Sequence, residues 1–116
     1  MTISAAEAEE YASWFRCLSD PTRVRILNHV AEAAEPVTVG EIVEAIGKSQ
    51  STVSRHLQVL ADDRFVFTEA DGVRTLVTVN RLCMVELPRA ATAIMASAEL
   101  SNQGTAVAGQ RARTRR

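Results

Sequence analysis

The sequence predicts a single, mainly α-helical domain of five helices with one small β-hairpin. Three observations lead to this prediction. Within residues 38–60, two short amphipathic segments are joined by a tight turn. Two runs of β-favouring residues then flank a turn near residue 71, and apolar stripes at helical spacing lie near both ends of the chain. We assign residues 1–100 to this domain, since 116 residues suit one domain.

The first helix is expected from Ser4 to about Leu18. Ser4 and Glu7 form a capping box, in which each side chain bonds a backbone N–H of the first turn. One stripe of this helix is apolar and carries Tyr11, Trp14, Phe15 and Leu18.

The second helix is expected to start after Asp20, which is a suitable N-cap, with Pro21 at the first helical position. Arg23 and Arg25 follow within it. They are expected to contact DNA phosphates or to form ion pairs, and ion pairing is the commoner fate of such residues.

The third and fourth helices form a helix-turn-helix unit. Thr38 and Glu41 make another capping box, and an apolar side of Ile42, Val43 and Ile46 follows. Gly47 is a natural left-handed stop, and Ser49 is placed to cap the next helix. In such units the second helix lies in the major groove of DNA.

The fourth helix has two different faces. Val53, Leu57 and Leu60 fall on its core side. The opposite side carries hydroxyl, amide and guanidinium groups, and no acidic residue occurs from 46 to 61. These groups suit base edges and phosphates, although a serine-rich amphipathic helix on any soluble domain is the alternative. The expected DNA-binding residues here are Lys48, Ser49, Gln50, Ser51, Thr52, Ser54, Arg55, His56 and Gln58.

A β-hairpin is expected directly after the fourth helix. Residues 64–69 alternate, residues 70–72 (Ala-Asp-Gly) form a turn, and residues 73–79 return as the second strand. Arg74 lies just past the tip, where it is placed to contact phosphate or a minor groove. A solvated strand charge is the equally weighted alternative.

At this point the chain resembles the ArsR/SmtB family of bacterial transcriptional repressors. The resemblance rests on three stretches: residues 18–27 (LSDPTRVRIL), residues 51–60 (STVSRHLQVL) and the hairpin of residues 65–79. It implies a winged helix-turn-helix fold, with the hairpin as the wing. Two features depart from the family pattern. Arg64 stands where a glycine is common, so the helix end there is expected to be built differently, and Leu76 and Val77 stand in a strand that usually carries a tyrosine.

The resemblance also implies a homodimer that pairs through the two terminal helices and binds an inverted-repeat operator in double-stranded DNA. Near the C-terminus, Leu87, Ala91, Ile94 and Ala98 recur at coiled-coil spacing, with Met84 and Met95 beside them. Pro88 is tolerated there if the helix begins near Glu86 or Leu87. The alternative is that both terminal stripes only complete the core of one subunit.

The charge distribution sets the C-terminal residues apart. The formal charge is −1, and the tail holds 4 of the 13 basic residues, so 9 bases against 14 acids leave −5 for residues 1–110. Residues 101–116 are expected to be a disordered basic tail. A body this acidic must concentrate its DNA affinity at the helix and wing. No long apolar run or signal peptide occurs, so a cytoplasmic protein without a membrane span is expected.

The regulatory signal is the least constrained property. Cys17 and Cys83 are the two cysteines, and we expect them at the end of the first helix and just before the last. Where these helices meet, two thiolates would bind a thiophilic metal or metalloid ion or respond to a thiol-reactive compound. The alternative is that both are inert buried side chains. His29 and His56 are the only histidines, and a zinc or nickel site that uses them is the less favoured possibility.

No enzyme is expected. The sequence contains no Ser/His/Asp order, glycine-rich phosphate loop or zinc-ligand spacing. The predicted function is therefore that of a dimeric, sequence-specific repressor released from its operator by a metal, metalloid or thiol-reactive signal. The alternative is a winged-helix regulator that has no inducer site of its own and acts through a protein co-regulator.

Overall fold

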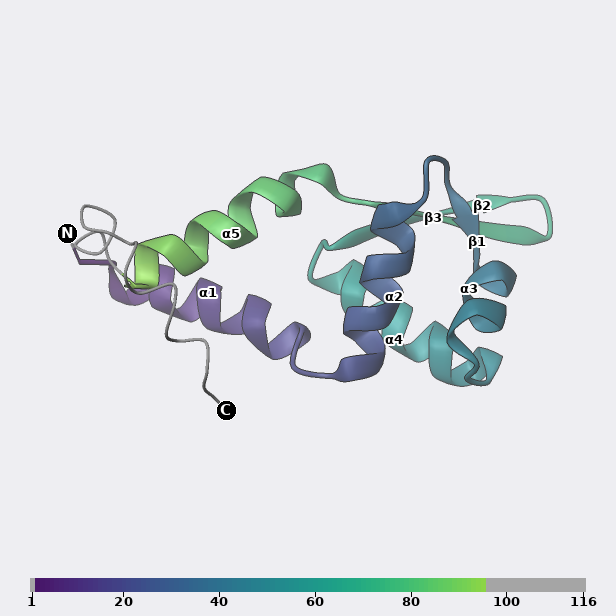
Figure 1. Ribbon diagram of the computed structural model, residues 1–116, viewed down its shortest axis with the longest axis horizontal. Helices are drawn as coiled ribbons and strands as arrows, with labels where there is room; N and C mark the ends of the chain where they lie inside the picture. The colour runs from purple at the N-terminus through teal and green to yellow at the C-terminus, as the bar shows by residue number, and fades with distance from the viewer. Residues whose placement is uncertain (1, 96–116) are drawn as a thin grey trace, which may run out of the picture.

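The computed structural model describes residues 2–95. Five helices and three short strands follow one another in the chain (Figure 1). The order is α1 (Ala5–Cys17), α2 (Pro21–Glu32), β1 (Val37–Thr38), α3 (Val39–Ile46), α4 (Gln50–Asp62), β2 (Val66–Asp71), β3 (Arg74–Val79) and α5 (Arg81–Met95). The mainly helical fold with a β-hairpin wing is thus confirmed. The predicted tail at 101–116 and Ala98 of the terminal stripe lie outside the described residues.

The sheet has one strand more than the expected hairpin. Its order is β1-β3-β2, all antiparallel. In β1, Val37 pairs with Val77 and Thr38 with Leu76. The two residues are β-branched and follow a proline, but a strand this short carries almost no periodic signal. By pairing with β3, β1 fixes the start of α3 against the base of the wing.

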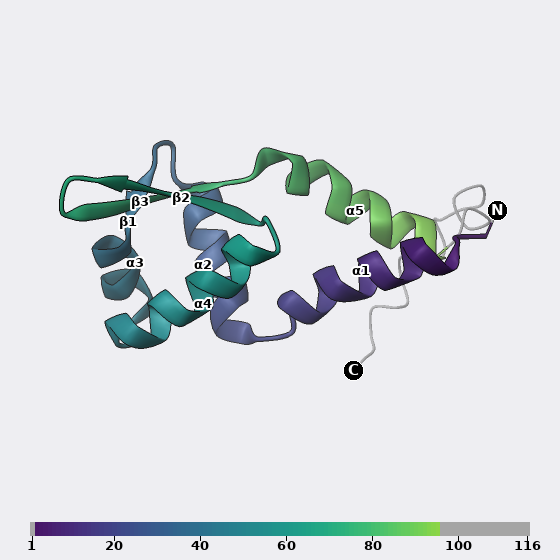
Figure 2. The same ribbon diagram turned by 180° about the vertical axis from the view of Figure 1, so that it is seen from behind.

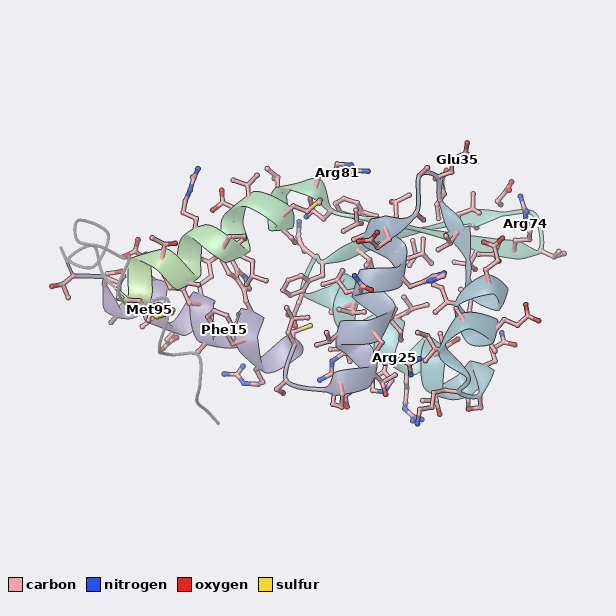
Figure 3. All side chains as sticks on the ribbon, in the orientation of Figure 1. Phe15, Arg25, Glu35, Arg74, Arg81 and Met95 are labelled. Atoms are coloured by element: carbon pink, nitrogen blue, oxygen red, sulfur yellow. The ribbon has the colours of Figure 1, made fainter. Side chains whose placement is uncertain are left out.

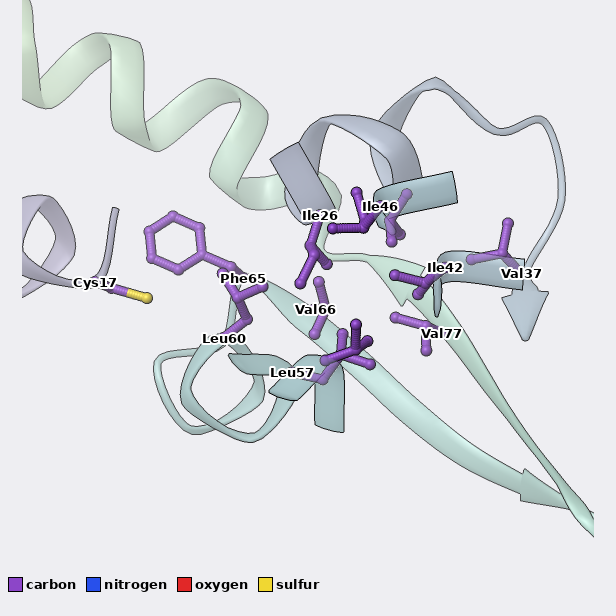
Figure 4. Close-up of a cluster of buried hydrophobic side chains, with 12 residues drawn as sticks. Cys17, Ile26, Val37, Ile42, Ile46, Leu57, Leu60, Phe65, Val66 and Val77 are labelled. Carbon is purple, nitrogen blue, oxygen red and sulfur yellow. The ribbon is translucent and has the colours of Figure 1, made fainter. Parts of the chain in front are cut away.

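The core lies where α2, α3 and α4 meet the inner face of the sheet (Figure 4). Its largest fully buried side chains are Phe65, Ile26, Ile42, Leu60, Val53, Val66 and Val77. Full burial of one such side chain contributes about 1.5–3 kcal/mol. These contacts come from elements far apart in the chain, so the core holds the helix-turn-helix and the wing as one unit.

The predicted starts of α1, α2 and α3 and the predicted stop of α3 are confirmed. Ser4 and Glu7 form their capping box, as do Thr38 and Glu41. Asp20 caps α2 by accepting hydrogen bonds from two backbone N–H groups. Gly47 ends α3 with a φ of 79°, in the left-handed region where a side chain would be strained.

Two expectations about helix ends are wrong. The last helix begins at Arg81, rather than at Glu86 or Leu87, because the Asn80 side chain accepts a bond from the N–H of Leu82 and starts it earlier. Cys83 therefore lies inside α5, as does Pro88, which supplies no N–H to the turn before it. At the end of α4, Arg64 adopts a φ of 64°, so the backbone keeps the form that a glycine would take.

The helices α1 and α5 extend together from one side of the winged unit (Figures 1 and 2). Trp14 of α1, Leu18 directly after that helix and Leu87 of α5 pack against the core. Farther from it, both helices leave apolar side chains exposed. No helix within residues 2–95 is long and apolar enough to cross a membrane.

Candidate nucleic-acid interface

The helix-turn-helix positions α4 by burying one side of each helix. Ile42 and Ile46 of α3 and Val53, Leu57 and Leu60 of α4 are all buried. The turn between the helices is also held from α2, because Arg25 donates from its Nη1 to the carbonyl of Ile46 at 3.3 Å. This bond satisfies a carbonyl at the C-terminal end of α3, where a cation is favourable. The expected ion pair of Arg25 is replaced by this backbone contact.

The opposite side of α4 faces solvent. Every residue predicted to bind DNA is exposed except Thr52 and His56, which are half-buried. The exposed members are Lys48, Ser49, Gln50, Ser51, Ser54, Arg55, Gln58 and Arg74. The division into a core face and a polar face that the sequence predicts is therefore present.

Hydroxyl groups organise the N-terminus of α4. The Oγ of Ser49 accepts from the N–H of Thr52 at 3.2 Å and donates to the Oγ1 of Thr52 at 3.0 Å. The Oγ of Ser51 lies 3.3 Å from that of Ser49. Ser49 thus caps the helix by bonding Thr52, while the partial positive charge of the helix N-terminus points outward. Such a terminus is a favourable place for a phosphate.

Gln58 is held by an acidic neighbour in the described structure. Its Nε2 donates to the Oδ1 of Asp62 at 2.9 Å, one helical turn farther along α4. While this bond is made, the amide group presents its oxygen rather than this N–H to a partner. The spacing of four residues in the sequence is the signal by which this pair is recognisable.

The side chain of His56 is half-buried and contacts the start of α2. The Nη1 of Arg23 lies 3.1 Å from its Nδ1, and because a guanidinium only donates, this ring nitrogen is the acceptor. The Nε2 lies 4.0 Å from the Oδ1 of Asp20. The Nε of Arg23 also donates to the carbonyl of Cys17 at 2.6 Å. Arg23 therefore joins the end of α1 to α4, which sequence reasoning missed because the partners lie far apart in the chain.

The N-cap role of Asp20 makes its ionised form favourable. The N–H groups of Arg23 and Thr22 donate to its carboxylate, at 3.1 and 2.8 Å. These bonds, with the nearby His56 and the charge of Arg23, lower the pKa of Asp20 below its usual value. Asp20 thus stabilises the start of α2 and faces His56 across the junction.

The wing presents Arg74 near its tip (Figure 3). Its Nη2 donates to the Oδ2 of Asp71 at 2.7 Å, across the two residues of the turn. Both side chains remain about half exposed, so solvent screens this pair and its contribution to stability is small. The guanidinium is accessible at the place that the sequence predicts.

The two cysteines lie in different surroundings, and both are reduced. Cys17 is buried, and this burial, with the Asp63 carboxylate beside it, raises the pKa of its thiol to about 12. The Sγ of Cys83 donates to the carbonyl of Arg64 at 3.4 Å, and burial raises its pKa as well. Within residues 2–95 no group of three His, Cys, Asp or Glu side chains is arranged to hold a metal ion. One subunit therefore shows no third ligand for these thiols among residues 2–95, and a thiolate site of Cys17 and Cys83 stays a prediction.

This chain is similar to known bacterial regulatory proteins. Residues 20–67 match the family described as bacterial regulatory protein, arsR family. The chain is 34% identical over 78 residues to a probable mercury resistance operon repressor of Streptomyces lividans, and the match covers 67% of this chain and 61% of that protein. Over 64 residues it is 34% identical to MJ1325 of Methanocaldococcus jannaschii, an uncharacterized HTH-type transcriptional regulator, covering 55% and 71%.

The fold also matches a solved structure. NolR from Sinorhizobium fredii superimposes with a TM-score of 0.64 at 26% identity, covering 81% of this chain and 95% of that chain. By contrast, the chain spans less than two thirds of the Streptomyces lividans repressor. The family model itself covers α2 to the start of β2, and so includes the helix-turn-helix that carries α4.

Proposed function

Because the chain belongs to the ArsR family of bacterial regulatory proteins, we propose that it is a transcriptional repressor that binds an inverted repeat in double-stranded DNA as a homodimer. The observation that carries this proposal is the exposed face of α4. It is polar and without an acidic residue through Ala61, in a chain whose acids outnumber its bases. A face of this composition is suited to a polyanion.

The residues on this face divide into two roles. Arg55 and Gln58 have the side chains that read bases, since a guanidinium bonds guanine and an amide bonds adenine in two places each. Lys48, Ser51 and Ser54, with Gln50 at the helix start, suit phosphate contacts that position the helix. The bond to Asp62 occupies one of the two N–H groups of Gln58, and leaving Asp62 frees both for a base. His56 acts through Arg23 on the position of α4 rather than on DNA.

The exposed apolar side chains of the terminal helices support the homodimer. Between 41 and 68% of the surface of each is exposed, which is unusual for several large apolar residues on adjoining helices. They are Phe15 on α1 and Leu82, Met84, Val85, Ile94 and Met95 on α5. A second copy of the chain covers them in a two-fold dimer. That symmetry presents two α4 helices to half-sites about one helical turn, roughly 34 Å, apart.

The surroundings of Cys17 bear on the signal that releases the repressor from DNA. The name of the Streptomyces lividans relative suggests mercury, a thiophilic ion. Among residues 2–95 of one subunit, no group of three suitable side chains is placed to hold such an ion, and the Cys17 thiol is buried, with a raised pKa and Asp63 and Arg23 as neighbours. Release of DNA through Cys17 and Cys83 therefore stays a prediction, which variants of these two cysteines test.

The DNA-binding proposal is tested by selecting an operator and measuring affinity by fluorescence anisotropy. Arg55→Ala is expected to weaken operator binding by about 1–3 kcal/mol while changing binding to random duplex much less. Arg89→Ala, which removes the same charge from α5, is the control and is expected to leave both affinities unchanged. Equal losses on operator and random DNA for Arg55→Ala contradict its role as a base reader. Absence of any duplex binding at moderate salt favours a protein-partner function instead.

A further inference from the structure

A cavity of about 350 Å³ lies on the side of the core away from the wing. It is enclosed by α1, by the connection between α4 and β2, and by the first turns of α5. Its apolar wall includes Trp14, Phe65 and Leu87. Figure 4 shows the Phe65 ring directed toward the side where the end of α1 and α5 lie. The volume and the mixed lining are those of a site for a small organic molecule.

The charges around this cavity favour one class of ligand. Four carboxylates line it, from Glu10, Asp62, Asp63 and Glu86, against the single guanidinium of Arg64. An anion is therefore repelled. A bare metal ion is disfavoured too, because the described part of the chain holds no cluster of three suitable ligands. An organic cation satisfies both the carboxylates and the apolar wall.

We propose that this cavity is an effector site for a small organic cation, an amine carried on an aromatic or aliphatic body. Trp14 contributes an indole, the aromatic group that interacts most favourably with such cations. Phe65 and Leu87 accept the apolar body, and the carboxylates on α1 and α5 accept the ammonium group. Glu10 and Glu86 come from two different helices, so an occupied site joins α1 to α5.

One residue connects this site to α4. Asp62 lines the cavity, and its Oδ1 accepts the hydrogen bond from Gln58. A cation that engages this carboxylate weakens it as an acceptor for the amide, so that Gln58 is freer to turn toward a base edge. This second step rests on the proposed function, whereas binding itself does not. By linkage, the ligand then tightens operator binding by the factor by which the operator tightens ligand binding.

Binding is measured on the full chain without DNA, by calorimetry and by the fluorescence of Trp14, the only tryptophan. Three probes share one body and differ in charge: 2-phenylethylammonium, 2-phenylethanol and 3-phenylpropanoate. The cation is expected to bind at least about tenfold more tightly than either of the others, because only its charge is opposite to that of the site. Equal binding of the cation and the neutral alcohol, or no binding of the cation, overturns the proposal.

Variants locate the site. The double variant Glu10→Gln/Glu86→Gln is expected to weaken binding of 2-phenylethylammonium about fivefold or more, since each partly exposed carboxylate contributes modestly. Glu9→Gln removes the same charge from the neighbouring position of α1, which does not line the cavity, and serves as the matched control. Equal effects of Glu9→Gln and Glu10→Gln overturn the assignment to this cavity. Circular dichroism confirms that each variant is folded.

The link to DNA has its own measurement. Saturating 2-phenylethylammonium is expected to raise operator affinity about threefold in the unmodified protein, which is the effect of one added amide contact to DNA. In Gln58→Ala the probe is expected to bind as before without changing operator affinity. Binding of the probe with no effect on the operator overturns the link through Asp62. Failure of the protein to bind any duplex contradicts the proposed function and leaves the calorimetric result unaffected.

Discussion

Arg64 holds a backbone conformation that is unfavourable for an arginine. Its φ of 64° costs a residue with a side chain roughly 1 kcal/mol or more. Backbone and side-chain hydrogen bonds around Arg64 hold it in this conformation. The N–H of Arg64 donates to the carbonyl of Ala61 at 3.0 Å, and the N–H of Phe65 donates to that of Leu60 at 2.8 Å, which closes α4 as a Schellman motif. The Arg64 carbonyl in turn accepts from the Nδ2 of Asn80 at 2.8 Å.

Replacing Arg64 by glycine is therefore expected to stabilise the protein. Arg64→Gly should raise the free energy of unfolding by about 0.5–1 kcal/mol, because glycine adopts a positive φ without steric cost. Urea denaturation followed by circular dichroism measures this. Arg64→Ala, which removes the guanidinium but keeps a Cβ, is the control and should not stabilise. A gain of equal size in both variants would mean that side-chain charge, rather than backbone strain, decides the effect.

The raised pKa of the Cys17 thiol makes a pH-dependent prediction. The folded protein binds this proton more tightly than the unfolded chain does, since the pKa rises from 9.0 to about 12. Its contribution to stability is thus complete below pH 9 and is lost as the pH rises toward 12. Alkylation at pH 8, followed by mass spectrometry, should modify native Cys17 at least about 100-fold more slowly than the unfolded chain, because only the thiolate reacts. Rapid native alkylation of Cys17 would contradict its burial.

Metal ions, arsenite and an oxidant test whether the thiols sense a signal. Operator binding is compared for the unmodified protein and for Cys17→Ser/Cys83→Ser, with arsenite, zinc, nickel and a mild oxidant added in turn. Because burial raises the pKa of both thiols, and so opposes loss of the proton that a metal ion displaces, we expect the two proteins to respond alike, within about twofold of each other. A release of DNA that only the unmodified protein shows would establish the thiols as the signal site.

At the scale of elements, the wing and α4 have different expected effects on DNA. The described wing offers one basic side chain, Arg74, partly neutralised by Asp71 at 2.7 Å. Arg74→Ala should weaken binding to operator and random duplex alike and lower the dependence on salt by about one phosphate contact. Asp71→Ala should strengthen binding to both duplexes and raise the dependence on salt, because it frees the guanidinium of Arg74. Anisotropy titrations at several salt concentrations measure both, and a change confined to the operator would make Arg74 a base reader.

At the scale of the whole molecule, the terminal helices decide the assembly. Val85 on α5 is about half exposed in one subunit. Val85→Glu should raise the dimer dissociation constant about 100-fold or more, roughly 3 kcal/mol, because it buries an unpaired carboxylate at the interface. Val73→Glu, at the fully exposed tip of the wing, is the matched control and should remain dimeric. Light scattering at micromolar concentration measures both. A monomeric unmodified protein would contradict the proposed dimer.

The local elements of this protein are predictable because their causes are local. The capping pairs at Ser4 and Thr38, the stop at Gly47 and the two faces of α4 all depend on residues within one or two helical turns. The same holds for the exposure of Arg55, which the helical period of 3.6 places on the outer side, and of Arg74, which lies just past the turn of the hairpin. The family resemblance then supplies the arrangement of these elements.

Contacts between distant residues are decided only by the tertiary structure. Nothing near His56 in the chain indicates that it bonds Arg23, and nothing near Val37 indicates that it pairs with Val77. The raised pKa of Cys17 depends on its burial and then on Asp63, and the start of α5 depends on how Asn80 binds the end of α4. Sequence patterns report the environment that a residue needs, whereas packing determines which distant residue provides it.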